Sequence, residues 1–410
     1  MIGLPNELEE HEADFHSNDK PITLHRFQRI AKTTDSISSS GLEVPILGLF
    51  GEVGSLVSVL KKKHRKDSLD YKFYDPAISE ELGDVIWYIS CICSRAEIQL
   101  SAVGWSASGN INSWDRLHEN KKEVLFTSIQ RDVVSYSDKF HSIEEVIISI
   151  AGRVGKLLNE YRVDGFDHNS ASLASHLIDI LRDVASASIK SGLSLDLAVR
   201  DNIKKILSRW PIKKSFHVLN DSGFGENERF PGRLKFNINE IAIGGKYYVI
   251  QKCNGIIIGD RLTDNKVEKD DYRFHDVFHF SFAVNLGWSP VLRALLHLKR
   301  KSNPSVDENE DGARAILIEE GIASFIFNRG VKRDLYRNSS SVDYDLLKYI
   351  QDFVRGYEVD KCYLWQWEKA ILDAFHVFRL LKEHRSGTVI VDFNAHCLTF
   401  IAPGDNCECA

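Results

Sequence analysis

The chain has 410 residues, 43% of them hydrophobic and 27% charged, which is enough for two or three domains with a sizeable core. Its formal net charge of −6 argues against binding of nucleic acid through an overall positive field. Seven scattered cysteines without a Cys-x-x-Cys pair fit reduced thiols better than a disulfide framework. The polar N-terminal stretch does not resemble a signal peptide, and no run approaches the roughly 18 apolar residues of a membrane span. We therefore expect a cytoplasmic protein without a membrane segment.

Residues 1–22 are acidic and polar, and we expect a flexible lead-in there. Apolar residues then recur at helical spacing in LHRFQRIAKTTDS, VPILGLFGEVGSLVSVLKKKHRK and PAISEELGDVIWYISCICSRAEI. The Gly- and Ser-rich stretch GWSASGNINS, residues 104–113, is expected to interrupt the helices. These segments define a first helical domain over residues 23–115.

A second helical domain, residues 116–211, repeats the first at an offset of about 100 residues. The segment AGRVGKLLNEY (151–161) aligns with FGEVGSLVSVL (50–60), and ILRDVASASI (180–189) aligns with ELGDVIWYIS (81–90). The apolar and glycine positions agree, whereas the polar positions diverge. Arg153, Lys156 and Ile180 stand where the first copy has Glu52, Ser55 and Glu81. The second copy is therefore expected to keep the packing residues and to lose most of the carboxylates.

The character of the sequence changes after Trp210-Pro211. Residues 235–262 and 387–401 have the alternation and β-branched residues of strands, and Gly-Gly in the first stretch predicts a hairpin. Helical patterns occupy the residues between, at 271–299, 311–328, 343–356 and 363–384. The predicted fold class is mainly α: a tandem helical bundle followed by a C-terminal α+β domain, residues 212–410, with a small antiparallel sheet.

Carboxylates on two helices of the first repeat form the first candidate site. Glu52 and Ser55 are three residues apart and share a helix face, as do Glu81 and Asp84 on the next helix. Packing these faces together creates an oxygen-rich site suited to Mg²⁺ or Mn²⁺. Glycines beside Glu52, at positions 51 and 54, are expected to allow close helix approach. The alternative is a solvated acidic face, which is the usual role of such pairs.

Residues 24–103 contain the segments FQRIAKTT, LGLFGEVGSLVSVLKKK and EELGDVIWYIS. On the strength of these segments, this part of the chain resembles a MazG-like nucleotide pyrophosphohydrolase. The resemblance implies an all-α fold that binds Mg²⁺ through Glu52, Glu81 and Asp84 and cleaves an NTP or dNTP to the monophosphate and pyrophosphate. Ser55 stands where the family has a further Glu. The resemblance also implies phosphate contacts from Lys62 or Lys63.

The family's Asn-Ile-x-Lys segment is distorted in the first copy and clean in the second, where it contains Asn202 and Lys205. Because relatives assemble from several helical hairpins, the resemblance implies a pseudo-dimer within one chain. The first repeat would supply metal ligands, and the second would supply substrate contacts from Asn202 and Lys205. A homo-oligomer of the whole chain is also compatible with the resemblance.

A second candidate metal site lies in the C-terminal domain. His275 and His279, in HDVFH, are four residues apart and can face one metal from one helix. Glu319 and Glu320 stand in an otherwise apolar helical run, where a carboxylate is costly unless it is paired or coordinated. This set predicts Zn²⁺ or another transition metal, and the alternative is a pair of satisfied core histidines.

Asp276 occupies the place of the general-base Glu in H-E-x-x-H metalloproteases, and the His-Asp pair lacks the other ligands of HD-type phosphohydrolases. Neither family therefore accounts for the site. Further along, residues 299–301 are expected to form a solvated basic patch, and residues 306–312 an acidic loop.

The leading hypothesis is an enzyme that hydrolyses phosphoanhydride bonds: a Mg²⁺-dependent NTP pyrophosphohydrolase fused to a metal-dependent hydrolase domain. The alternative is a nucleotide-binding sensor or scaffold, weakened at Ser55, that regulates a C-terminal effector domain. The predicted partner is a nucleoside triphosphate, without direct nucleic-acid binding.

Overall fold

The computed structural model describes residues 21–35, 41–64, 74–109, 123–167 and 170–405. The chain divides into two compact units, Met1–Lys213 and Lys214–Ala410, each with its own hydrophobic core. The lead-in expected at 1–22 falls almost wholly outside the described residues.

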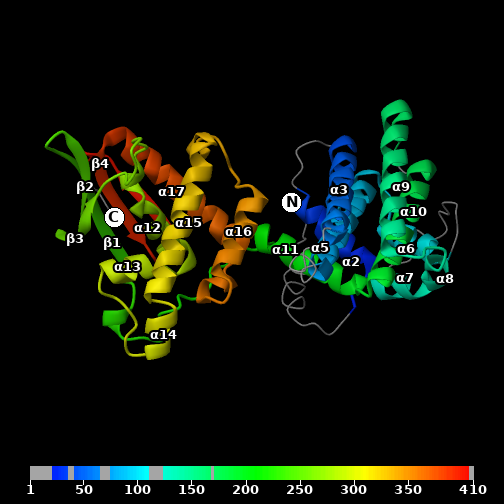
Figure 1. Cartoon of the computed structure of the whole chain (residues 1–410), viewed down its shortest axis with the longest axis horizontal. Helices are drawn as coiled ribbons and strands as arrows, with labels where there is room; N and C mark the ends of the chain where they lie inside the picture. The colour runs from blue at the N-terminus through cyan, green and yellow to red at the C-terminus, as the bar shows by residue number, and fades with distance from the viewer. Residues whose placement is uncertain (1–20, 36–40, 65–73, 110–122, 168–169, 406–410) are drawn as a thin grey trace, which may run out of the picture. The chain divides into compact units, whose positions relative to one another are not determined.

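Unit 1, as far as it is described, is a bundle of α-helices. They are α2 (Leu24–Thr34), α3 (Glu43–His64), α5 (Tyr74–Arg95), α6 (Leu100–Ser108), α7 (Phe126–Asp132), α8 (Val134–Ser137), α9 (Ile143–Asp164), α10 (Ala171–Ser191) and α11 (Leu195–Arg209). The long helices α3, α5, α9 and α10 run side by side (Figure 1). Serines cap α9, α10 and α11, since each accepts a hydrogen bond from a backbone amide of the first turn.

The two repeats of unit 1 make matching contacts. In the first, the Gln28 side chain on α2 donates to the carbonyl of Ile98 (2.8 Å) and accepts from the amide of Leu100 (2.9 Å). In the second, Gln130 on α7 donates to the carbonyl of Leu193 (2.7 Å) and accepts from the amide of Leu195 (3.0 Å). An equivalent glutamine in each repeat thus forms hydrogen bonds at the start of the last helix of that repeat.

The repeats also exchange these last helices and share one core. Helix α11 of the second repeat packs on α5 of the first, while α6 of the first packs on α10 of the second. Thr23 and Leu125, which precede the first helices of the two repeats, form a β-bridge with each other. Buried apolar side chains from both repeats belong to a single cluster. The apolar surface of either repeat is therefore completed by the other.

Glycines of unit 1 contribute differently from the sequence expectation. A Cβ at Gly51 or Gly54 would meet nothing within 4 Å, so the expectation that they allow close helix approach was wrong. The tight position is Gly48, where a Cβ would lie 2.1 Å from the Tyr88 ring on α5. Of the stretch 104–113 expected to interrupt the helices, residues 104–108 belong to α6, and residues 110–113 lie outside the described part of the chain. Gly104 lets α6 pack closely against α2 and α7.

Among the described residues, helix α3 is long and apolar enough over Glu43–Lys63 to cross a membrane, so the expectation that no segment approaches this was wrong. Length and composition alone do not separate such a span from a central helix of a bundle. Helix α3 packs on α5 and α9, and it exposes Leu47, Phe50 and Val57 on its outer face.

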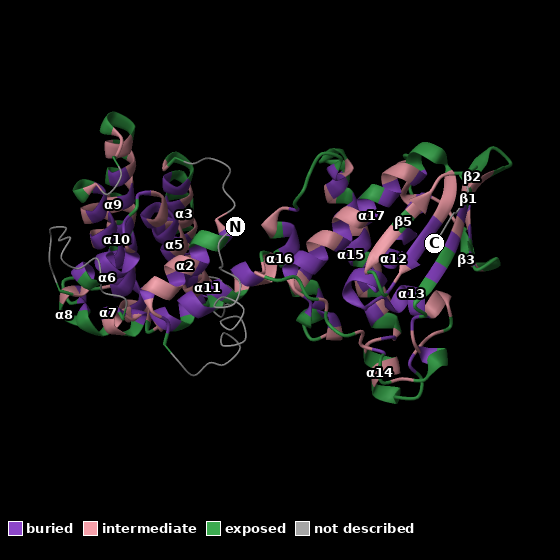
Figure 2. Ribbon diagram, turned by 180° about the vertical axis from the view of Figure 1, so that it is seen from behind, coloured by how far each residue is buried: buried purple, intermediate pink, exposed green. Residues whose placement is uncertain are grey.

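Unit 2 contains a five-stranded antiparallel sheet, as predicted. Its strands are β1 (Arg233–Ile243), β2 (Lys246–Cys253), β3 (Ile256–Leu262), β4 (Ser386–Asp392) and β5 (Cys397–Ile401), in the order β3-β2-β1-β4-β5. The β1–β2 hairpin turns at Gly244-Gly245, which both have positive φ. Along β1 the buried residues Leu234, Phe236 and Ile238 alternate with more exposed ones, so one face of the sheet is covered (Figure 2).

Unit 2 also contains helices, of which α12 (Asp276–Leu286) and α17 (Leu364–His384) cover that face. Further helices are α13 (Pro290–Leu295), α14 (Pro304–Asn309), α15 (Ala313–Val331) and α16 (Tyr344–Val354), with 3₁₀ turns at Glu226–Glu228, Tyr272–Phe274, Asp334–Tyr336 and Glu358–Lys361. Helices α12 and α17 pack on each other and on β4 and β5. Every residue of α12 is buried, which makes it the central helix of the unit.

Two expectations about charged segments of unit 2 were wrong. Arg300 is 1% exposed and forms ion pairs with Asp311 (2.7 Å) and Glu358 (2.8 Å), so it is no part of a solvated patch. The segment expected as an acidic loop at 306–312 contains most of α14, which Asn303 caps by accepting from two backbone amides. A cap and a proline at the first helical position outweigh the acidic composition there.

Candidate functional site

The carboxylates of Glu52 on α3 and of Glu81 and Asp84 on α5 lie together in unit 1. One oxygen from each falls within 4.8 Å of the other two, and all three residues are half-buried. Glu81 and Asp84 are one helical turn apart and therefore point to the same side of α5, toward α3. The structure thus brings these three predicted ligands into one cluster, which we call the carboxylate cluster.

Burial and neighbouring negative charges raise the pKa values of two members of this cluster. Burial, followed by the negative charge of Asp84, raises the pKa of Glu52 to about 7. Burial and the charge of Glu52 likewise raise the pKa of Glu81 to about 7. Without a cation, the cluster therefore resists carrying all its negative charges at neutral pH. A divalent metal ion bound by these oxygens would offset the repulsion between the carboxylates.

Helix α11 of the second repeat completes the cluster. Asn202 donates to Asp84 Oδ1 at 2.6 Å, and Lys205 Nζ donates to Asp84 Oδ2 at 2.6 Å. The Lys205 ammonium also lies 3.7 Å from a carboxylate oxygen of Glu80. Gly83 allows this approach, since a Cβ there would lie 2.9 Å from the carbonyl oxygen of Ala198 on α11. Both residues predicted from the second repeat are therefore at the cluster.

The two lysines of α3 that were predicted to contact phosphates lie away from the carboxylate cluster. Lys63 forms an ion pair with Glu144 of α9 at 3.1 Å and lies over the ring of Tyr74. It follows Glu52 by eleven residues, which corresponds to about 16 Å along a helix. Lys62 is exposed one residue earlier. Ser55 lies one turn after Glu52 on α3 and is half-buried.

The equivalent position in the second repeat is neutralised by an arginine. Asp183 accepts hydrogen bonds from Tyr136 (2.8 Å), Ser149 (2.7 Å) and Arg153 Nε (2.6 Å). Arg153 also pairs with Asp179. The guanidinium stands at the sequence position of Glu52, so a fixed positive charge occupies the second repeat where the first gathers three carboxylates. The carboxylates of Asp179 and Asp183 are thus paired with an arginine, which opposes the binding of a cation there.

A pocket of about 500 Å³ adjoins the carboxylate cluster. Glu80, Asn202 and Lys205 line the side next to the cluster, and the wall includes Pro76 and Leu197. Among the described residues, none donates a hydrogen bond to the buried amide oxygen of Asn202, although the amide nitrogen donates to Asp84. A buried acceptor left unpaired is costly, so this oxygen is suited to accept from a ligand. The pocket has the size and mixed lining of a small-molecule site.

Sequence reasoning missed Tyr88, which lies one turn after Asp84. Its ring lies against Gly48, and burial together with the charge of Glu52 raises the pKa of its hydroxyl to about 12. Its spacing of four residues from Asp84 indicated a shared helix face, but its apolar neighbours in the sequence are typical of a core residue.

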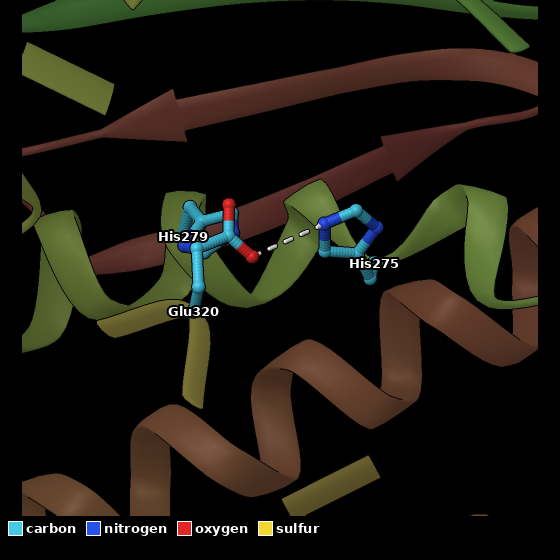
Figure 3. A group of neighbouring side chains, drawn as sticks. All are labelled: His275, His279 and Glu320. Carbon is cyan, nitrogen blue, oxygen red and sulfur yellow. Dashed lines mark ion pairs between the residues drawn. The ribbon is translucent and has the colours of Figure 1, made fainter. Parts of the chain in front are cut away.

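The histidine cluster of unit 2 consists of His275, His279 and Glu320. One ligand atom from each lies within 4.8 Å of the others. Glu320 Oε2 is 3.7 Å from His275 Nε2, and Glu320 Oε1 is 3.6 Å from His279 Nε2. Figure 3 shows the Glu320 carboxylate, from α15, directed toward the His275 ring at the start of α12. These three predicted residues are therefore brought together.

Glu319 has a different environment. It is fully buried and accepts from His279 Nδ1 (2.8 Å), Ser289 Oγ (2.6 Å) and the amide of Val291 (2.8 Å). Although burial opposes it, the charge of Glu319 raises the pKa of His279 well above its ordinary value. Both carboxylate oxygens of Glu319 are used within the protein, so it orients His279 rather than facing the cluster.

Asp276 lies beside the histidine cluster. Its Oδ1 is 3.3 Å from His275 Nε2, and its Oδ2 accepts from Gln251 at 2.7 Å. The Tyr272 ring stacks on His275 with centroids 4.2 Å apart, and the Tyr272 carbonyl lies 2.9 Å from His275 Nδ1. The first histidine is thus held in place by its own preceding turn.

Residues 215–404 match the family model of the MazG C-terminal domain, which covers nearly all of unit 2. The match supports a relation to MazG proteins, but it lies in the C-terminal half, which resembled no known family at the sequence level. The resemblance found in the residues lay at 24–103, in the other half. The Gene 37 protein of Mycobacterium phage L5 is 34% identical over 70 residues, which are 17% of this chain and 61% of the phage protein. No solved structure matches the chain.

Proposed function

We propose that unit 1 is a Mg²⁺-dependent nucleoside triphosphate pyrophosphohydrolase. The observation that carries the proposal is the carboxylate cluster of Glu52, Glu81 and Asp84, set beside a pocket that shares Asn202 and Lys205 with it. The match of residues 215–404 to the MazG C-terminal domain supports a nucleotide substrate at the level of the family.

The cluster fits a hard divalent cation. Its donors are carboxylate oxygens, which Mg²⁺ and Mn²⁺ prefer, and burial followed by the neighbouring carboxylate charges raises the pKa values of Glu52 and Glu81. A bound cation would offset both effects. When bound there, Mg²⁺ would neutralise phosphate charge and activate a water for in-line attack on a phosphorus atom. The half-buried position leaves room for waters and phosphate oxygens in the coordination sphere.

Different residues would contact the nucleoside and the phosphates of the substrate. The pocket beside the cluster would take the nucleoside against Pro76 and Leu197, with the Asn202 amide oxygen accepting a hydrogen bond. Lys205 pairs with Asp84, and a cation bound to Asp84 would release the Lys205 ammonium toward the phosphates. The products are a nucleoside monophosphate and pyrophosphate.

The experiment is a panel of NTPs and dNTPs incubated with the full chain and Mg²⁺, with monophosphate and pyrophosphate as the measured products. Asp84→Asn should abolish turnover, and Lys205→Ala should lower kcat/KM by about 10- to 100-fold, since one charge contact to the reacting phosphates is lost. Lys204→Ala is the matched control, because Lys204 is a neighbouring exposed lysine that pairs only with Asp201 among the described residues.

Absence of product from every nucleotide would refute the enzyme. Ser55, at the position of a fourth carboxylate, favours the nucleotide-binding sensor as the second candidate. Its signature would be nucleotide-dependent thermal stabilisation without turnover, and this stabilisation should disappear in Lys205→Ala.

A further inference from the structure

We infer that His275, His279 and Glu320 form a binding site for one divalent transition-metal ion in unit 2. The site is separate from the carboxylate cluster and does not depend on the function proposed for unit 1. It is a mononuclear site with two imidazole nitrogens, one carboxylate and an open coordination position.

The hydrogen bonds of the two imidazoles fix which nitrogen can bind a metal. His275 Nδ1 lies 2.9 Å from the Tyr272 carbonyl, which can only accept, so this nitrogen carries the proton. His279 Nδ1 donates in the same way to the Glu319 carboxylate at 2.8 Å. In the neutral rings both Nε2 atoms therefore present lone pairs. A carboxylate or carbonyl on the distal nitrogen is the usual support of a metal-binding histidine.

These lone pairs face negative charge. His279 is fully buried, and no group in the described part of the chain forms a hydrogen bond with its Nε2. The nearest carboxylate oxygen, from Glu320, is 3.6 Å away, which is too long for a hydrogen bond. His275 Nε2 faces Glu320 at 3.7 Å and Asp276 at 3.3 Å. A positive charge between these groups satisfies all of them at once.

The separations match the spacing of ligands around one metal ion. Donor atoms at about 2.1 Å from a tetrahedral metal lie about 3.4 Å from each other. The two distances from Glu320 to the histidines, 3.6 and 3.7 Å, are close to this value. Small side-chain adjustments would therefore close the set around a metal.

The donor set selects the class of metal. Two imidazoles and one carboxylate suit Zn²⁺ or Fe²⁺, whereas Mg²⁺ prefers oxygen ligands alone. The Glu320 side chain is 41% exposed while both histidines are buried, so solvent reaches the site from the Glu320 side. With three protein ligands, a position remains for water or substrate, as in catalytic rather than structural sites.

The alternative is that His275 and His279 are imidazolium cations paired with Glu320, Asp276 and Glu319, without a metal. The test uses the full chain, stripped of metal by a chelator and titrated with Co²⁺ as a spectroscopic probe, followed by competition with Zn²⁺. Wild-type protein should bind one Co²⁺ with visible ligand-field absorption that Zn²⁺ displaces. Asp84→Asn should leave this strong absorption unchanged, because octahedral Co²⁺ bound only by oxygen ligands in unit 1 would absorb far more weakly.

Variants separate the ligands from the orienting residue. Glu320→Gln and His279→Gln should each weaken Co²⁺ binding by more than about 100-fold, and Glu319→Gln by about 10- to 100-fold because the site remains but is poorly oriented. His376→Gln, an exposed histidine of α17, is the matched control and should bind as wild type does. Glu320→Gln is the deciding variant if the buried His279 variant fails to fold. Absence of the absorption in wild-type protein, or unchanged affinity in folded Glu320→Gln, would overturn the metal site.

Discussion

Replacing Glu81 by Gln should raise the stability of metal-free protein while removing its activity. The pKa of Glu81 is raised from 4.5 to about 7 in the folded chain. At 1.36 kcal/mol per pKa unit this corresponds to about 3 kcal/mol for a group shielded from solvent. Because Glu81 is only half-buried, solvent screening reduces the figure to about 1–2 kcal/mol. The neutral amide keeps the shape of the side chain and removes one charge from the cluster.

The sign of the pH dependence follows from the raised pKa. A carboxyl group whose pKa is higher in the folded state than in the unfolded state binds its proton more tightly when folded. Its cost is therefore absent below about pH 4.5 and fully present once the pH has risen above about 7. Glu81→Gln should exceed wild type in stability at about pH 8 and lose most of that advantage at about pH 5.

Scanning calorimetry of the full chain in EDTA measures this difference. A gain of about 1–2 kcal/mol in a unit of this size corresponds to a rise of about 2–6 °C in the Tm of its transition. Addition of Mg²⁺ should stabilise wild type and leave the variant unchanged, while kcat/KM of the variant falls by at least about 100-fold. Glu97→Gln, an exposed position just after α5, is the control. A variant that is less stable than wild type in EDTA, or equally improved at both pH values, would refute the electrostatic reasoning.

The other predictions concern the surroundings of the cluster. Arg153→Met should destabilise the protein by about 3 kcal/mol in calorimetry, because Asp183 has a fully buried side chain and loses its counter-charge. Gly83→Ala should displace α11 from the cluster and lower kcat/KM by about tenfold or more, whereas Gly51→Ala, which meets no neighbour, should retain activity. Ser55→Glu should lower the Mg²⁺ concentration for half-maximal turnover about tenfold by adding a fourth carboxylate.

Each of these has a clear contrary outcome. An Arg153→Met protein as stable as wild type would mean that the buried Asp183 side chain does not depend on the Arg153 guanidinium. Equal activity of the Gly83 and Gly51 variants would separate α11 from function. A Ser55→Glu protein with unchanged Mg²⁺ dependence would place this side chain outside the coordination sphere.

Local pattern was sufficient for much of the architecture. Helical spacing predicted the long helices of unit 1, and alternation with Gly-Gly predicted the hairpin of the sheet, because both signals depend on neighbours a few residues apart. The predicted ligand pairs came together for the same reason. Glu81 and Asp84 are one turn apart, and His275 and His279 are also one turn apart, so the helix itself aligns each pair.

Local pattern failed where a distant partner decides the environment. Gly51 and Gly54 suggested close packing, but the tight contact is at Gly48, where the Tyr88 ring of another helix arrives. Arg300 resembled a surface cation, yet Asp311 and Glu358 pair with it and permit its burial. The environment of a charge depends on the groups that reach it across the fold, and these are not encoded in its own segment.

By itself, the sequence determined the class of fold and the residue types of two candidate metal sites, since periodicity and spacing fix which side chains share a helix face. It also predicted the duplication within unit 1. Only the tertiary structure decided which of those side chains meet. It placed Asn202 and Lys205 on Asp84 from the other repeat, and it separated Glu320, which faces the histidines, from Glu319, which orients one of them. Neighbouring positions on a helix point about 100° apart, so a single-residue step changes the role of a carboxylate, and only the packing partner shows which role it has.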